Sequence, residues 1–505
     1  MRKGRRPTPP YRVTLDSSGA QPGSRASRPH ARQLTIGQRR ARLIVALAAF
    51  VLVVAVVVNG LGASGLSGAP PATIVDGAGP GDPFAYRSAH AADFVARATT
   101  GNAHVLFSKS PGGALATAAR VAALRPAIDR AVAGTAIDPN LLEGLVFVES
   151  AGRPDAIAGT DPANAAGLTQ ILAATGQSML GMHIDLAASR RLTNRINAVE
   201  NGARGRLGPL LAQREAADDR FNTTKELTAT VRYLETARQQ FGRTDLAIES
   251  YHMGIGNLHQ VLADYDSGRP VPYAQLYFDS SPTRHAAAFG LMAGFSDDSV
   301  LYYWRVLGAV AIMHLYRTDR GALERLAALQ TADDAGGAVL HSLTRPYTDP
   351  AALSTAYQHR ELVPLPSNAT SLGIDVAADM GAGADRVGAP RSLYRGLRPV
   401  ALRLLIDLTA EVRRLSGVAA PLRIASTAQD QRYQQEIGST QPIYPPSATG
   451  FSFEIQRRYA NGAQAGALQS TLDRLQSLNL IAWAREPSTI EVTVASDAAA
   501  WLGSQ

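Results

Sequence analysis

Glu149 is the residue of this sequence best suited to donating a proton. The segment AIDPNLLEGLVFVESAGRP predicts a helix with Asp138 as its N-cap and Pro139 in its first turn, which Gly152 ends. Glu149 then lies in the last turn, where the negative end of the helix dipole and the apolar neighbours both favour the protonated carboxyl. A carboxyl held in that form can serve as a general acid.

Other acids compete with Glu149 for this role. Glu143 lies six residues earlier, which at about 100° per residue places it on a different side of the helix. Glu249 and Tyr251 are likewise separated by about 200° and share no face. The remaining competitors are Asp155, Asp161 and Glu200. Taken alone, a glutamate at a helix end is also typical of an ordinary solvated residue, so the assignment depends on what surrounds it.

Cofactor chemistry has little support in the sequence. The chain has no cysteine, which excludes disulfides, cysteine-bound zinc, iron–sulfur clusters and a cysteine nucleophile. Its ten histidines include no HExxH motif and no pair at metal-ligand spacing, and no glycine-rich loop is followed by Lys-Ser or Lys-Thr. We expect no metal and no cofactor in the catalytic region.

Three short motifs follow one another within about 110 residues. They are Glu149-Ser150, then GLTQI at 167–171, then SYHMGIGN at 250–257. Each is weak by itself, since glycines also serve tight turns and close packing. In this order and at these separations they resemble the signatures of the lytic transglycosylases with a goose-type-lysozyme-like fold.

The resemblance implies cleavage of the β-1,4 bond between N-acetylmuramic acid and N-acetylglucosamine in peptidoglycan. Glu149 would be the sole general acid and then base, and the N-acetyl group and 6-hydroxyl of the substrate would supply the nucleophiles, ending in a 1,6-anhydro sugar. The usual pair of carboxylates is not required in such a substrate-assisted reaction.

The resemblance also implies roles for four further residues. Ser150 would orient near Glu149, Gln170 would bind sugar or the neighbouring loop, Tyr251 would place its hydroxyl near the reacting centre, and Asn257 would hold the helix turn. For Tyr251, packing in the core is an equal alternative.

The elements that must position these residues are helical. Residues 84–340 show apolar side chains at three- and four-residue spacing and few strand signals, which predicts an all-helical, lysozyme-like domain. The segment 341–395 mixes Pro, Gly and Asp and is expected to be a linker or irregular subdomain. Residues 396–505 alternate helix patterns with strand candidates in PLRIAST and IEVTVA, which predicts an α+β domain.

The C-terminal domain, 396–505, resembles more faintly the zinc-dependent D-alanyl-D-alanine carboxypeptidases. Aligned on Gly450, however, Ser447 occupies the first histidine position and Glu454 the aspartate position, and Glu491 replaces the last histidine. Zinc sites use thiolate, imidazole and carboxylate, so the loss of both imidazoles predicts a retained fold without peptidase activity. A generic α+β domain remains the alternative.

The N-terminal part predicts attachment to a membrane. Residues 43–63 carry no charge and are long enough to cross a hydrocarbon core of about 30 Å. Arginines precede this span and none follows before Arg87, so the N-terminus is expected to be cytoplasmic and the rest outside. Residues 64–83 read as a flexible linker. A cleaved signal peptide is the alternative, and it would still export the chain.

The charge distribution argues against nucleic acid as a partner. The 505 residues carry a formal charge of +8, but eleven Lys and Arg against one acid lie in residues 1–42, a basic tail expected to be disordered. The remainder sums to −2, so no basic footprint is spread over the folded part.

The sequence therefore predicts a single-pass cell-membrane protein that faces outward and cleaves peptidoglycan strands. Cell-wall assembly proteins are candidate partners. The alternatives are a non-catalytic wall-binding or scaffold protein and a hydrolytic lysozyme that uses water.

Overall fold

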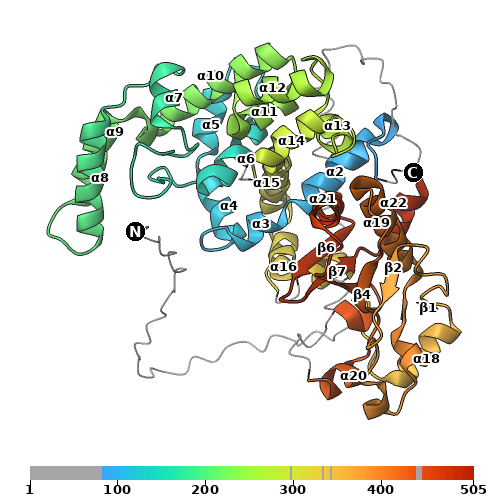
Figure 1. Ribbon diagram of the computed structural model, residues 1–505. Helices are drawn as coiled ribbons and strands as arrows, with labels where there is room; N and C mark the ends of the chain where they lie inside the picture. Colours follow the sequence, from blue (N-terminus) through green and yellow to red (C-terminus); the bar gives the residue numbers. More distant parts are fainter. Residues whose placement is uncertain are drawn as a thin grey trace, which may run out of the picture.

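The computed structural model describes Asp82 and residues 84–295, 298–332, 335–341, 344–438 and 446–504. Figure 1 shows an arched molecule in which a helical part leads at one end into a projecting helical pair and at the other into a region containing a sheet. The expected membrane span at 43–63 and the basic tail at 1–42 lie outside the described residues. Within the described part, no helix is long and apolar enough to cross a bilayer.

The part expected to be helical is mostly helical, with a long loop at 151–172, shorter connections and isolated bridges between the helices. Its helices are α2 (Ala91–Gly101), α3 (His104–Ser108), α4 (Ala114–Ala123), α5 (Arg125–Val132), α6 (Pro139–Ser150), α7 (Ala173–Ser178), α8 (Leu186–Glu200), α9 (Leu207–Ala217), α10 (Thr223–Phe241), α11 (Thr244–Met253), α12 (Ile255–Asp266), α13 (Tyr273–Asp279), α14 (Ala286–Gly294), α15 (Tyr302–Thr318), α16 (Arg320–Gln330) and α17 (Ala335–His341). The longest of these, α10 and α15, frame the region in which the three motifs meet.

Helix α6 forms as its sequence predicts. The Asp138 carboxylate caps it by accepting a hydrogen bond from the backbone N–H of Asn140 at 2.7 Å. The helix ends because Ala151 and Gly152 both adopt the left-handed conformation, with φ of 56° and 73°. Glu149 therefore lies in the last turn of α6.

Helix α6 packs closely against α15. At Gly144 a Cβ atom would come within 2.8 Å of the carbonyl oxygen of Val306 and of the Cγ2 atom of Val310. Only glycine lets the two helices approach this far, because any side chain would push them apart. The close approach fixes the position of the first residue of α15, Tyr302, relative to the end of α6.

The C-terminal region is α+β, as expected. A five-stranded sheet has the order β2-β4-β5-β7-β6, with β2 parallel to β4 and the other neighbours antiparallel. Its strands are β2 (Ile374–Val376), β4 (Leu422–Ser426), β5 (Ser452–Gln456), β6 (Ile481–Arg485) and β7 (Thr489–Val494), with α19 (Pro399–Ser416) and α21 (Gly462–Ser477) as the long helices. Shorter elements complete it: α18 (Pro350–Gln358), β1 (Val363–Pro364), β3 (Gly396–Leu397), α20 (Gln431–Glu436) and α22 (Ala498–Ser504).

Part of the segment 341–395, expected as a linker or irregular subdomain, contributes to this sheet. Strand β2 pairs along its three residues with β4, from Ile374 opposite Leu422 to Val376 opposite Ile424. The pattern was hard to see in the sequence because a three-residue strand shows almost no alternation.

The helical and C-terminal parts share one hydrophobic core. The ring of Trp501, at the end of the chain, stacks on Phe84 at 6.5 Å and meets Phe94 edge-on at 5.9 Å. Beside it the guanidinium of Arg474 donates to the carbonyl oxygens of Phe84 and Phe278 and pairs with Asp82 at 3.1 Å. These contacts join residues that are between 196 and 417 positions apart, so the two parts stabilise each other.

We predict that Trp501→Ala lowers the free energy of unfolding of the full-length protein by about 3 kcal/mol, because removal of a buried tryptophan leaves a cavity at the junction. Urea unfolding followed by circular dichroism measures this loss. Trp483→Ala, which removes a partly buried tryptophan of β6, is the matched control and should cost less. If both variants lost the same free energy of unfolding, the junction would contribute no more to stability than the packing of β6.

Candidate functional site

The carboxyl group of Glu149 is largely shielded from solvent at the end of α6. The phenol of Tyr302 donates a hydrogen bond to its Oε1 atom at 2.7 Å. Burial raises the pKa of Glu149 from 4.5 to about 7, and the bond from Tyr302 opposes that rise only in part. Near neutral pH a large share of Glu149 therefore carries a proton that it can donate.

The loop of the GLTQI motif is held by a buried acid from α10. Glu226 is fully buried, and its two carboxylate oxygens accept bonds from the backbone N–H groups of Leu168 and Thr169, both at 2.8 Å. The Thr169 hydroxyl also donates to Glu226, at 3.0 Å. Burial raises the pKa of Glu226 to about 8, against the effect of these hydrogen bonds.

Gly167 is required where this loop meets α10. Its φ is +89°, and a Cβ atom there would lie 2.1 Å from the carbonyl oxygen of Arg220 and 2.2 Å from Oε1 of Glu226. A side chain has no room in that position, so glycine is needed for the loop to reach its anchor.

Gln170 turns back onto its own loop. Its backbone is left-handed, with a φ of 51°, and its side-chain amide donates to the carbonyl oxygens of Gly167 at 2.8 Å and Ala156 at 3.2 Å. Of the two roles expected for Gln170, the bond to the neighbouring loop is present in the structure, and contact with sugar stays a prediction.

Tyr251 connects the second motif with the third. Its hydroxyl donates to the carbonyl oxygen of Thr169 at 2.8 Å, and its ring lies parallel to that of Tyr302 with 6.3 Å between the centroids. Burial raises the pKa of the Tyr251 phenol well above its usual range, and the neighbouring charge of Glu149 adds to the rise. The three motifs therefore meet around Glu149, Tyr302 and Thr169.

Ser150 and Asn257 lie at helix ends beside this group. The hydroxyl of Ser150 is buried and donates along its own helix to the carbonyl oxygen of Val146 at 3.3 Å. The Asn257 amide donates to the carbonyl oxygen of Met253, the last residue of α11, at 2.8 Å. Both bonds stabilise local backbone, and the expected roles of Ser150 beside Glu149 and of Asn257 in the helix turn stay predictions.

The competing acids have other partners. Glu143 is buried between the guanidinium groups of Arg125 and Arg317, which pair with it. Glu249 is also buried and accepts the backbone N–H of Tyr303 at 2.9 Å, with its pKa raised to about 8 by burial. Asp161 forms a surface pair with Arg190. Glu249 shares with Glu149 a raised pKa and the influence of a tyrosine hydroxyl, that of Tyr273. Its side chain is fully buried, however, whereas Glu149 is only partly buried and can reach a ligand.

Two members of the site were missed in the sequence. Tyr302 begins α15 more than 150 residues after Glu149, so sequence spacing could not relate the two. Glu226 had a usable signal, since an acid next to Leu227 and one helical turn before Thr230 lies on a face that is otherwise uncharged.

A second polar cluster surrounds Ser447, the residue expected at the first histidine position of a zinc peptidase. The amide of Gln434 donates to the Ser447 hydroxyl at 2.5 Å and to the side-chain oxygen of Gln429 at 3.3 Å, and the Gln429 amide donates to the Ser426 hydroxyl at 2.8 Å. Hydroxyls and amides bonded to one another are poor zinc ligands.

The two acids expected near this cluster lie opposite each other in the sheet. Glu454 and Glu491 are directly paired residues of β5 and β7. Among the described residues, no group of three or more His, Cys, Asp or Glu side chains is placed to hold a metal ion. The donor set therefore does not fit zinc.

Comparison with known proteins bears on the helical part. Residues 126–204 match the family described as the Transglycosylase SLT domain. The matched stretch includes α6 with Glu149, the loop at 167–171, and α8, and it stops before the third motif. No curated protein matches the chain. The match supports a lytic-transglycosylase-like, lysozyme-like region in this chain whose substrate is peptidoglycan.

Proposed function

We propose that this protein is a lytic transglycosylase that cleaves the β-1,4 bond between N-acetylmuramic acid and N-acetylglucosamine, with Glu149 as the general acid and base. The observation that carries the proposal is the Glu149 carboxyl, whose pKa is raised to about 7 and which accepts a bond from Tyr302 at the point where three motifs meet. The match to the SLT family over residues 126–204 supports the same substrate class.

In the first step the protonated carboxyl of Glu149 gives its proton to the glycosidic oxygen. The bond between that oxygen and C1 of the muramic acid breaks, and the carbonyl oxygen of the N-acetyl group attacks C1. In the second step the Glu149 carboxylate takes the proton of the 6-hydroxyl, whose oxygen attacks C1 and displaces the N-acetyl oxygen. The product is a 1,6-anhydro sugar, and Glu149 is again protonated.

The surroundings of Glu149 suit both steps. Burial favours the neutral acid before the reaction, and the Tyr302 hydroxyl stabilises the carboxylate once the proton has left. The paired carboxylate of an ordinary glycosidase has no counterpart in the described site, since Glu143 is taken up by two arginines and Glu226 by the loop.

We propose in addition that the protein is anchored in the cell membrane through residues 43–63 with its folded part outside. The uncharged span and the arginines that precede it support this topology. A tethered enzyme would act on glycan strands close to the membrane.

We predict that Glu149→Gln abolishes the release of fragments from purified peptidoglycan, because the amide cannot donate the proton. Mass spectrometry of the products measures this, and the wild type should release 1,6-anhydro ends. Asp155→Asn, at an exposed competing acid, is the control and should keep wild-type activity. Reducing ends from the wild type would identify a lysozyme, and no fragments a wall-binding protein.

We predict that Tyr302→Phe lowers kcat and also moves the alkaline limb of the pH profile upward. Activity requires protonated Glu149 and should fall as the pH rises through about 7. The Tyr302 bond lowers the pKa of Glu149, so its loss should raise that pKa. A profile with an unmoved alkaline limb would limit Tyr302 to packing.

We predict that Glu149→Gln makes the protein more stable at alkaline pH. The folded state holds the Glu149 proton up to about pH 7, whereas the unfolded chain releases it near 4.5, so stability falls as the pH rises between these values. At pH 8 the variant should gain about 3 kcal/mol over the wild type. Urea unfolding at pH 5 and pH 8 measures the difference, and a gain of equal size at both values would contradict the raised pKa.

A further inference from the structure

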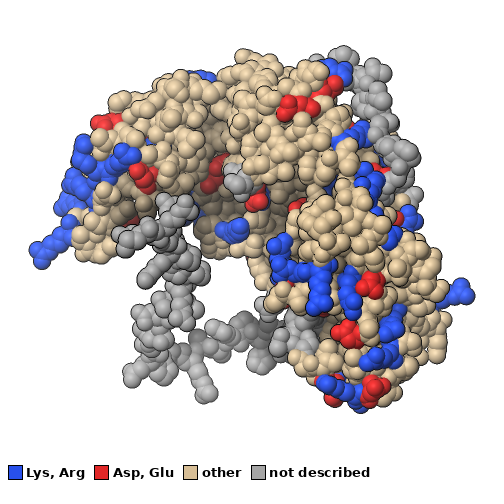
Figure 2. Space-filling model, viewed as in Figure 1, with Lys and Arg blue, Asp and Glu red and all other residues tan. Residues whose placement is uncertain are grey.

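The helical pair α8 and α9, with the connecting residues 201–206, forms the projecting arm of Figure 1. The arm carries six arginines and two glutamates, a net charge of +4, while the whole chain after residue 42 sums to −2. Figure 2 shows basic side chains gathered on this end of the molecule. The arm is thus a basic part of a folded chain that is slightly acidic as a whole.

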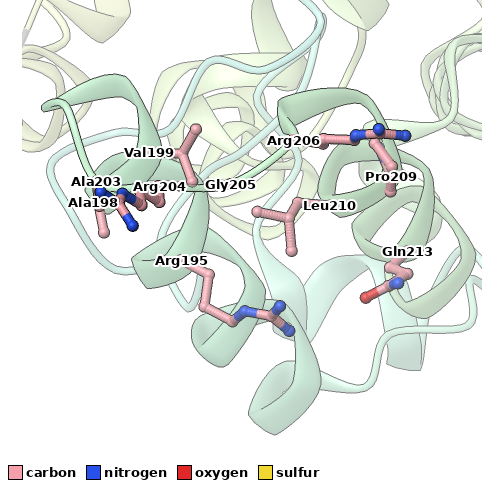
Figure 3. A pocket seen from close by; sticks show the side chains of 10 residues that line it. All are labelled: Arg195, Ala198, Val199, Ala203, Arg204, Gly205, Arg206, Pro209, Leu210 and Gln213. Atoms are coloured by element: carbon pink, nitrogen blue, oxygen red, sulfur yellow. The ribbon is translucent and has the colours of Figure 1, made fainter.

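The tip of the arm contains a hollow of about 320 Å³. Val199 and Leu210 are among its apolar lining residues, and Arg195, Arg204, Arg206 and Gln213 provide polar groups. In Figure 3, Leu210 lies in the middle of the hollow and the three arginines lie on different sides of it.

The loop that closes the hollow is packed. A Cβ atom at Gly205 would lie 2.6 Å from Cγ2 of Val199, so the loop backbone rests directly on the apolar floor. Arg206 precedes the first residue of α9, whose first turn has neither a side-chain cap nor an acidic residue. This end of α9 therefore adds to the positive potential around the hollow.

The arginines of the hollow lack acidic partners. Arg190 pairs with Asp161 at the base of the arm, whereas Arg195, Arg204 and Arg206 have no carboxylate within 4 Å among the described residues. All three are exposed, so their guanidinium groups are available to an outside ligand. Guanidinium groups recognise carboxylates and phosphates through paired N–H donors.

The shape of the hollow favours a short peptide over a bilayer or a phosphate polymer. The large apolar side chains that are exposed in the described residues are Leu172, Met179 and Ile437, and none of them is on the arm, so its tip has nothing to insert into lipid. The guanidinium groups of the hollow lie on different sides of the apolar floor formed by Val199 and Leu210, and they do not converge on a single point. Such a site fits a ligand that carries separate carboxylates on a small aliphatic backbone.

We propose that the arm binds a stem peptide of peptidoglycan, with its carboxylates on Arg195, Arg204 and Arg206 and an alanine methyl group on Val199 and Leu210. This inference deepens the proposed function and rests on it for the choice of polymer. At helical rise the 15 residues of α8 span about 22 Å, so the tip of the arm projects about that far from its base.

The test is calorimetric titration of the full-length protein with the free stem tetrapeptide L-Ala-γ-D-Glu-meso-diaminopimelyl-D-Ala. We expect binding, and we expect Arg195→Gln combined with Arg204→Gln to weaken it at least about tenfold, because two charge-assisted contacts are lost. The matched control combines Arg238→Gln with Arg458→Gln, which removes the same charge at two exposed arginines elsewhere and should change the affinity less than twofold.

Each other outcome overturns the proposal. Absence of peptide binding removes the site, and equal weakening by both double variants shows non-specific attraction. Unchanged binding of a peptide whose carboxylates are amidated excludes the arginine contacts, and displacement of the peptide by poly(glycerol phosphate) at lower concentration assigns the hollow to a phosphate polymer. Because the tetrapeptide contains no sugar, the result is independent of Glu149, and a failure of the proposed reaction is seen separately in the digestion experiment.

Discussion

The chemistry proposed for this protein depends on the removal of one carboxyl group from water. Glu149 would ionise near pH 4.5 if it were solvated, and it keeps its proton to about pH 7 because it is partly buried at the end of α6, beside Tyr302 of α15. The single bond from Tyr302 is strong enough to orient the group and too weak to cancel the cost of ionisation. The rest of the helical part can be understood as the support for this balance.

That support consists of two close contacts that need glycine and one that needs an acid. Gly144 lets α15 approach α6, and Gly167 lets the loop reach Glu226. Glu226 in turn fixes the backbone of Thr169, whose carbonyl oxygen accepts the Tyr251 hydroxyl. Direct contacts therefore connect α10, the loop at 167–171 and α11. The ring of Tyr251 in α11 then stacks on the ring of Tyr302, which bonds to Glu149.

The sequence allowed most individual helices to be predicted. It did not allow the prediction of contacts between elements that are far apart along the chain. The cap and end of α6, the helical character of the first part, and the positions of β4, β7, α19 and α21 follow from patterns within a few residues. Strands β2, β5 and β6 were not predicted, and β2, with three residues, is too short to show any periodicity. Tyr302 and Glu226 reach the site through tertiary packing, which no spacing rule reports.

The shared core around Trp501 fixes the position of the C-terminal region relative to the helical part. A domain on a flexible linker samples many distances from its neighbour. This region is instead fixed to α2 by the contact between Trp501 and Phe94, and to α13 by the bond from Arg474 to Phe278, whose ring in turn contacts Phe94. The five-stranded sheet is therefore held at a fixed distance from Glu149, and a displacement of one part of the molecule has to move the other with it.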